Sequence, residues 1–246
     1  MQKSLKVLSA LLTYPTQDLK SAIPEIRAAL AEEGLLPEKN RHRLERIIDE
    51  IERNDLIDLQ ERYVLLFDRT RSLSLHLFEH VHGESRDRGQ AMVDLQQLYE
   101  SRDLAPTRDQ LPDFIPLFLD FLSRIDVAQA RSLLSEPAHI FEAIRLRLKK
   151  RKSTYSSVFS ASQALAKVQP KAHEVEAILN EPDPDPNDLE ALDAAWEEEE
   201  VLFGPTAAAG NSSMMAKMRS ANRPAPGMAR PEQRRTVFTH NAARQD

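Results

Sequence analysis

The sequence predicts an all-helical protein, a single-domain helical bundle followed by a disordered C-terminal tail. Two observations carry this prediction. Only three glycines, Gly34, Gly83 and Gly89, precede residue 203 in this chain of 246 residues, whereas tight hairpin turns depend on residues that tolerate positive φ. Apolar residues also recur three and four positions apart, as they do on the buried face of an amphipathic helix.

The expected helices follow one another between helix-breaking residues. The first occupies the N-terminal stretch before Pro15, where Leu5, Leu8 and Leu11 share one face. This stretch lacks the small-residue cleavage site of a signal peptide. Further helices are expected over about 18–34, after Pro37, over 56–67 behind the capping residue Asp55, over about 92–99, after Pro112, after Pro137 and over about 155–165.

The predicted body covers residues 1–168, and three segments of different composition follow it. Residues 169–186 include the run EPDPDP and are expected to form a Pro-rich linker region. Residues 187–203 are expected to form a C-terminal amphipathic helix that docks on the body through Trp196, the only tryptophan. Residues 204–246 lack apolar periodicity and are expected to form a disordered basic tail.

Charge and missing residue types exclude several classes of function. The formal net charge is -6, yet seven basic and two acidic residues follow Phe203, so the body is strongly acidic and unsuited to nucleic acid. The basic run Lys149–Lys152 is explained by the dipole at a helix C-terminus. There is no cysteine, and the glycine-rich phosphate loop, the nucleophile elbow and the dinucleotide fingerprint are all absent from the sequence.

These exclusions weigh against the common enzyme classes, and we expect a cytoplasmic protein with no cofactor. No uncharged apolar run is long enough to cross a bilayer, so stable membrane insertion is not expected. A structural adaptor whose basic tail contacts a membrane or nucleic acid remains one alternative. A metal-dependent hydrolase is another, because His76, Glu79 and His80 match the H-x-x-E-H pattern of inverted zinc peptidases. No third ligand is evident for such a zinc ion, so we expect no metal site.

The stretch that follows Ser74 combines aromatic, acidic and basic residues within a short span. Such a mixture is typical of a surface that recognises a peptide. The candidate partner-binding residues in it are Phe78, Glu79, His80, His82, Glu84, Arg86, Asp87 and Arg88. Histidines titrate near pH ~6.5, so His76, His80 and His82 predict that partner binding responds to pH.

The same stretch resembles a known family. FEHVHGESRDRGQAMVDL, residues 78–95, closely resembles the signature of the NarJ family of respiratory nitrate reductase assembly chaperones, within the wider TorD/DmsD group of redox-enzyme chaperones. YVLLFDR (63–69), LPDFIPL (111–117) and ALDAAWEEEEVLF (191–203) resemble further family segments. They add Tyr63, Phe67 and Asp113 to the candidate partner-binding residues. Phe114 stands where the family commonly has histidine, near which related chaperones have been assigned cofactor or nucleotide roles, so the departure argues against such a role here.

The resemblance implies an all-helical chaperone that is not itself an enzyme. Its partner would be the apo catalytic (alpha) subunit of nitrate reductase, bound in part through that subunit's N-terminal segment. The chaperone would keep the subunit competent for molybdenum cofactor and iron-sulfur insertion before membrane attachment.

Overall fold

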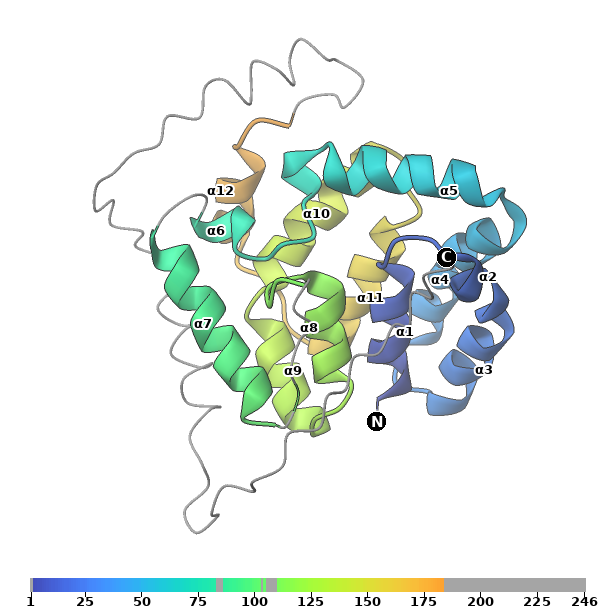
Figure 1. The fold of residues 1–246 in the computed structure, drawn as a ribbon, viewed down its shortest axis with the longest axis horizontal. Coiled ribbons are helices and arrows are strands. Elements are labelled where there is room, and N and C mark those ends of the chain that lie inside the picture. The colour runs from blue at the N-terminus through green and yellow to red at the C-terminus, as the bar shows by residue number, and fades with distance from the viewer. Residues whose placement is uncertain (1, 83–85, 103, 105–109, 184–246) are drawn as a thin grey trace, which may run out of the picture.

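The secondary structure is helical throughout the part of the chain that the computed structural model describes, residues 2–82, 86–102, 104 and 110–183 (Figure 1). The all-helical prediction is confirmed. An isolated antiparallel bridge between His76 and Phe114 is the one strand-like pairing among these residues. The helices are α1 (Lys3–Leu11), α2 (Gln17–Ser21), α3 (Ile23–Glu33), α4 (Glu38–Arg53), α5 (Leu56–Tyr63), the π-helical turn η1 (Val64–Asp68), the 3-10 turn η2 (Arg71–Leu73), α6 (Glu79–His82), α7 (Arg86–Glu100), α8 (Ile115–Leu122), α9 (Val127–Ser135), α10 (Ala138–Lys150), α11 (Ser156–Ala166) and α12 (Ala172–Leu179).

Local sequence explains most helix boundaries. The side chain of Asp55 accepts a hydrogen bond from Ile57 N and caps α5 as predicted. The single helix expected over 18–34 is instead two helices, α2 and α3, which meet at Ala22. Pro24 has no N–H to continue the helical ladder, so the chain restarts there with proline in the first turn. Gly34, with φ 65°, ends α3 in the left-handed conformation.

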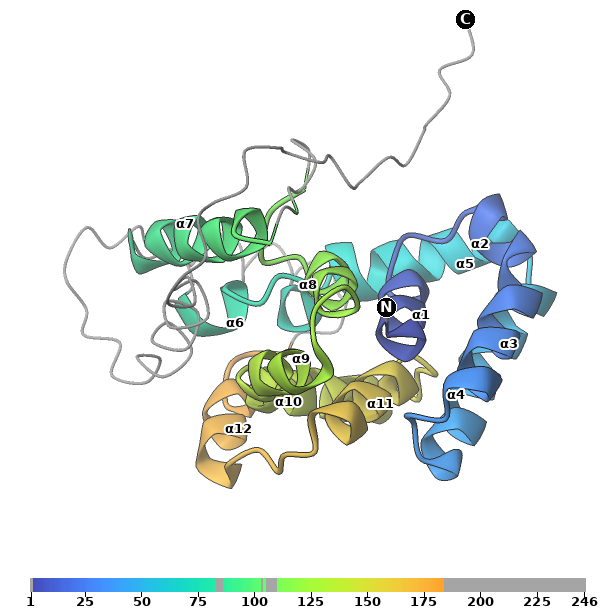
Figure 2. The ribbon, with the colours of Figure 1, turned by 90° about the horizontal axis from the view of Figure 1, so that it is seen from below.

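Helix α8 lies at the centre of the bundle, beside α1 and α9 (Figures 1 and 2). Each of its residues from Ile115 to Leu122 is buried. The one carboxylate among them, Asp120, is paired with Lys6 at 2.5 Å and with Arg124 at 3.0 Å. Pairing is what makes a buried charge tolerable in such a core.

The C-terminal part of the described chain packs α10 against both α11 and α12 (Figure 2). Residues 172–179 were expected within the linker region, and the structure corrects this because they form α12. The signal for a helix lies in Val175 and Ile178, which are three positions apart and both buried. The predicted amphipathic helix over 187–203 and the predicted tail over 204–246 lie outside the described residues. None of the described helices is both long and apolar enough to cross a membrane.

Candidate functional site

The segment that contains the predicted partner-binding residues is held against the segment before α8. Leu77 N donates to the carbonyl of Asp113 at 3.0 Å, and Ile115 N donates to the carbonyl of Leu75 at 2.8 Å. These bonds join two stretches that lie nearly forty positions apart in the chain. They fix the direction in which the chain enters α6.

The carboxylate of Asp113 reinforces this junction from inside the core. Asp113 is fully buried. Its Oδ1 lies 3.0 Å from His76 Nδ1, and its Oδ2 accepts a hydrogen bond from Phe78 N at 3.1 Å. We call the three residues His76, Phe78 and Asp113 the Asp113 brace.

The brace changes the protonation of its histidine. Burial lowers the pKa of His76, but the hydrogen bond and the charge of Asp113 outweigh burial, and the pKa is raised overall. Glu79 adds to the increase and Arg88 opposes it. The Phe114 ring lies 5.4 Å from the His76 ring, centroid to centroid.

The polar surface of the predicted site is the junction of α6 and α7. Arg88 donates to Glu79 Oε1 at 3.1 Å, and both side chains are partly exposed. Asp87 is exposed on the first turn of α7. Glu84 lies outside the described residues, and for His82 and Arg86 only the backbone is described.

The other predicted site residues are buried and face the core. Tyr63 donates from its hydroxyl to the carbonyl of Leu12 at 2.9 Å, and its ring lies 4.9 Å from that of Phe67. Phe78 is 1 % exposed. His80 Nε2 lies 2.8 Å from the carbonyl of Ser74, and burial lowers the pKa of His80. In this conformation none of these four side chains reaches the surface. Phe78 and His80 lie at α6, whereas Tyr63 and Phe67 pack against Tyr155 of the core and are not brought to the α6–α7 junction.

The alternative of a metal-dependent hydrolase required His76 and His80 on one helix face. This placement is wrong, because α6 begins only at Glu79 and His76 lies in the bridge before it. Nε2 of His80 is within hydrogen-bonding distance of the backbone carbonyl of Ser74 and is therefore not free to bind a metal ion. Within the described ranges, no group of three or more His, Cys, Asp or Glu side chains is placed to hold a metal ion.

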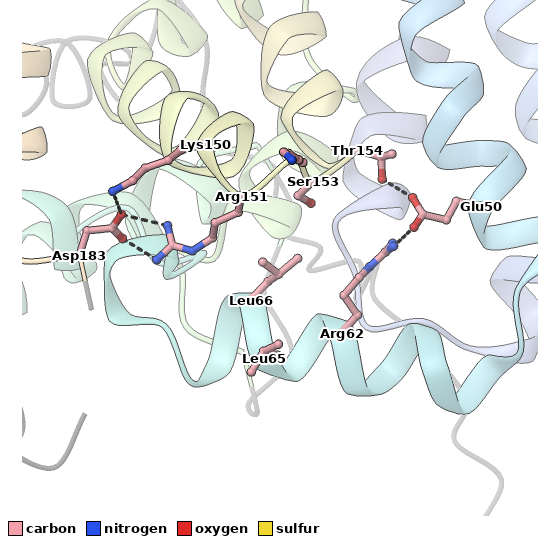
Figure 3. A pocket seen from close by; sticks show the side chains of 10 residues that line it. Glu50, Arg62, Leu65, Leu66, Lys150, Arg151, Ser153, Thr154 and Asp183 are labelled. Atoms are coloured by element: carbon pink, nitrogen blue, oxygen red, sulfur yellow. Dashed lines mark hydrogen bonds and ion pairs between the residues drawn. The ribbon is translucent and has the colours of Figure 1, made fainter. Parts of the chain in front are cut away.

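A pocket of about 580 Å³, which the sequence did not reveal, opens between α5, η1 and the loop that joins α10 to α11 (Figure 3). At one end Asp183 pairs with Arg151 at 2.7 Å and with Lys150 at 3.6 Å. At the other end Glu50 pairs with Arg62 and accepts from Thr154. The lining residues are Glu50, Arg62, Leu65, Leu66, Lys150, Arg151, Lys152, Ser153, Thr154 and Asp183.

Sequence reasoning also missed Arg147, which is 3 % exposed. Its guanidinium donates to the carbonyls of Ser72 at 2.9 Å, Ile178 at 2.7 Å and Glu181 at 3.2 Å. Through these hydrogen bonds, Arg147 of α10 stabilises the packing of η2 and of the end of α12 against α10. The available signal was its position three residues after Ile144, on the apolar stripe of α10.

Comparison with known proteins assigns the chain to a family. The nitrate reductase delta subunit family matches residues 16–161. The chain is 39% identical over 216 residues to the nitrate reductase molybdenum cofactor assembly chaperone NarJ of Escherichia coli (strain K12). The matched residues are 87% of this chain and 91% of that protein. It is 37% identical over 199 residues to the probable assembly chaperone NarW of the same strain, covering 81% and 83% of the two chains. It is 29% identical over 160 residues to the probable assembly chaperone NarJ of Bacillus subtilis (strain 168), covering 64% and 84%. This chain therefore belongs to the nitrate reductase delta subunit family.

Proposed function

We propose that this protein is a cytoplasmic, non-catalytic chaperone that binds the apo catalytic subunit of nitrate reductase. It keeps that subunit competent for molybdenum cofactor and iron-sulfur insertion before the subunit attaches to the membrane. The observation that carries the proposal is the similarity to assembly chaperones of nitrate reductase along 87% of the chain.

The predicted site supports a binding role through its division into two layers. Glu79, Asp87 and Arg88 lie at the surface, where they offer charges of both signs to a peptide. In the Asp113 brace beneath them, Asp113 and Phe78 are buried and hydrogen-bonded to each other, which favours surface groups that are already in place before a partner arrives. Preorganisation of this kind lowers the entropic cost of binding.

We propose that the N-terminal segment of the catalytic subunit binds over the junction of α6 and α7. Calorimetry with a synthetic peptide of that segment tests this. Combined Glu79→Ala and Arg88→Ala changes remove both members of one ion pair and should weaken binding roughly tenfold. Combined Glu38→Ala and Lys39→Ala changes are the matched control, because these residues form an exposed acidic and basic pair at the start of α4. Equal binding by the two variants would place the site elsewhere.

Among the predicted histidines whose side chains the structure describes, His76 is the one that should make binding respond to pH. His80 is buried with a lowered pKa, whereas the pKa of His76 is raised and its ring is partly exposed. As the pH falls through the pKa of His76, the site gains positive charge, so a basic peptide should bind more weakly and an acidic one more tightly. The same calorimetry at about pH 6 and about pH 8 measures the direction. A pH dependence that persists in a His76→Asn variant would remove His76 from this role.

A further inference from the structure

The pocket between α5, η1 and the α10–α11 loop has an apolar floor and a basic edge. Leu65 and Leu66 of η1 lie between the two charged ends of the pocket (Figure 3). Lys150, Arg151 and Lys152 line the edge where α10 ends. Lys150 and Lys152 are exposed, and Lys152 makes no ion pair with any residue of the described ranges. A groove with this chemistry fits an acidic amphipathic helix.

The chain itself contains such a segment. Residues 187–203 carry seven acidic side chains and no basic one, and four of the acidic residues are the consecutive Glu197–Glu200. Leu189, Leu192 and Trp196 recur at helical spacing. Charge and apolar pattern therefore both complement the pocket.

Only a short stretch of chain joins this segment to the pocket. Asp183, the last described residue, is part of the pocket wall. Its carboxylate forms a bidentate ion pair with the guanidinium of Arg151 and also accepts a hydrogen bond from the hydroxyl of Ser72 at 2.5 Å. Residue 187 is four positions further on and therefore lies within about 14 Å of this wall. Because the segment is tethered so near this pocket, its effective concentration at the pocket is high.

We propose that residues 187–203 bind in cis over this pocket, with Trp196 packed toward Leu65 and Leu66 and the Glu197–Glu200 run beside Lys150 and Lys152. This surface is separate from the α6–α7 junction, and the inference does not depend on the identity of the chaperone's partner. It assigns to the basic run Lys149–Lys152 a role beyond opposing the dipole of α10.

Trp196 makes the proposal testable in the full-length chain, because it is the only tryptophan and its fluorescence reports on this segment alone. We expect blue-shifted emission and restricted acrylamide quenching in the wild type. Combined Lys150→Glu and Lys152→Glu changes should shift the emission to the red and raise the quenching constant about twofold or more, because like charges then face the glutamate run. Replacing Glu197–Glu200 by lysine in the same variant should restore protection.

The matched control carries combined Lys39→Glu and Lys167→Glu changes. It alters the net charge equally, and Lys167 shares with Lys152 both an exposed side chain and a positive φ, 55° against 56°. Lys167 follows the far end of α11, roughly 20 Å from Lys152. We expect its emission and quenching to match the wild type.

Three outcomes would overturn the proposal. Wild-type quenching equal to that of free tryptophan would show an undocked segment. Protection that survives the Lys150→Glu and Lys152→Glu changes would place the segment elsewhere. Protection that disappears on dilution, together with a dimer in light scattering, would show that the segment binds a second copy and not its own chain.

Discussion

Replacing Asp113 by asparagine should destabilise the protein by an amount that depends on pH. The amide keeps the size of the carboxylate, but one of its two positions becomes a donor. That donor meets another donor at Phe78 N or at a protonated His76, whereas Nδ1 of a neutral His76 can accept a hydrogen bond from it. A buried donor left without an acceptor costs about 1–3 kcal/mol. Where His76 is also charged, the broken ion pair brings the expected loss to about 3–5 kcal/mol.

The sign of the pH dependence follows from the raised pKa of His76. A histidine whose pKa is higher in the folded protein than in the unfolded chain stabilises the fold fully below the unfolded value of ~6.5, and this contribution is lost as the pH rises through the folded pKa. Asp113→Asn removes most of the cause of the shift. The difference in stability between wild type and variant should therefore be larger at about pH 6 than at about pH 8.5.

Urea unfolding followed by circular dichroism at both pH values measures this difference. The pKa of His139 is lowered by burial, and its destabilising effect at low pH is the same in both proteins and cancels in the comparison. The pKa of His80 is also lowered by burial but is partly raised by the charge of Asp113, so Asp113→Asn adds through His80 to the loss at low pH. Asp58→Asn, on the exposed face of α5, is the control and should change stability by less than about 0.5 kcal/mol. If Asp113→Asn lowers the free energy of unfolding equally at the two pH values, the reasoning about His76 is wrong. If the loss is below about 1 kcal/mol at both pH values, the Asp113 brace does not stabilise the fold.

Four further predictions concern the rest of the chain. Arg147→Met should lower the free energy of unfolding by about 2–4 kcal/mol in urea titrations, because three carbonyls lose their donor. Tyr99→Phe should cost about 1–2 kcal/mol in the same assay, since the buried carbonyl of Pro112 loses its 2.7 Å partner. Truncation after Phe203 should leave the thermal midpoint nearly unchanged, and a large drop would show that residues 204–246 pack on the body. Elemental analysis should find no stoichiometric zinc; one zinc per chain that is lost in His76→Ala would contradict this.

The sequence predicted elements whose signal is local. Asp55 is a capping residue by its own chemistry, and the stripe of Leu44, Ile47, Ile48 and Ile51 defines the buried face of α4 without reference to any other helix. Apolar periodicity predicted the wrong helix boundaries where a proline lay within an apolar pattern. A continuous apolar pattern over residues 18–34 concealed the break at Ala22, because a proline interrupts hydrogen bonding without interrupting hydrophobicity.

The candidate site was predictable in its location along the chain but not in its exposure. Mixed chemistry marked the stretch after Ser74, yet no local rule shows that Phe78 and His80 point inward while Glu79 points outward. That arrangement depends on Asp113, which lies 35 positions from Phe78 in the chain. The pocket depends on pairings such as that of Asp183 with Arg151, which are likewise set by tertiary structure. Contacts between distant positions leave no periodic trace in a single sequence.

The central position of α8 has a consequence for synthesis of the chain on the ribosome. Helix α1 packs against α8 and α11, and α4 packs against α11, so the apolar faces made first are covered by residues 115–166. At roughly 5–20 residues per second, α4 is complete for about 6–23 s before α11 has been made. During this interval α1 and α4 can pack only against α3, and the parts of their apolar faces that contact α8 and α11 stay exposed. A protein that belongs to a family of assembly chaperones is therefore itself a late folder, whose N-terminal half has no closed core until two thirds of the chain exists.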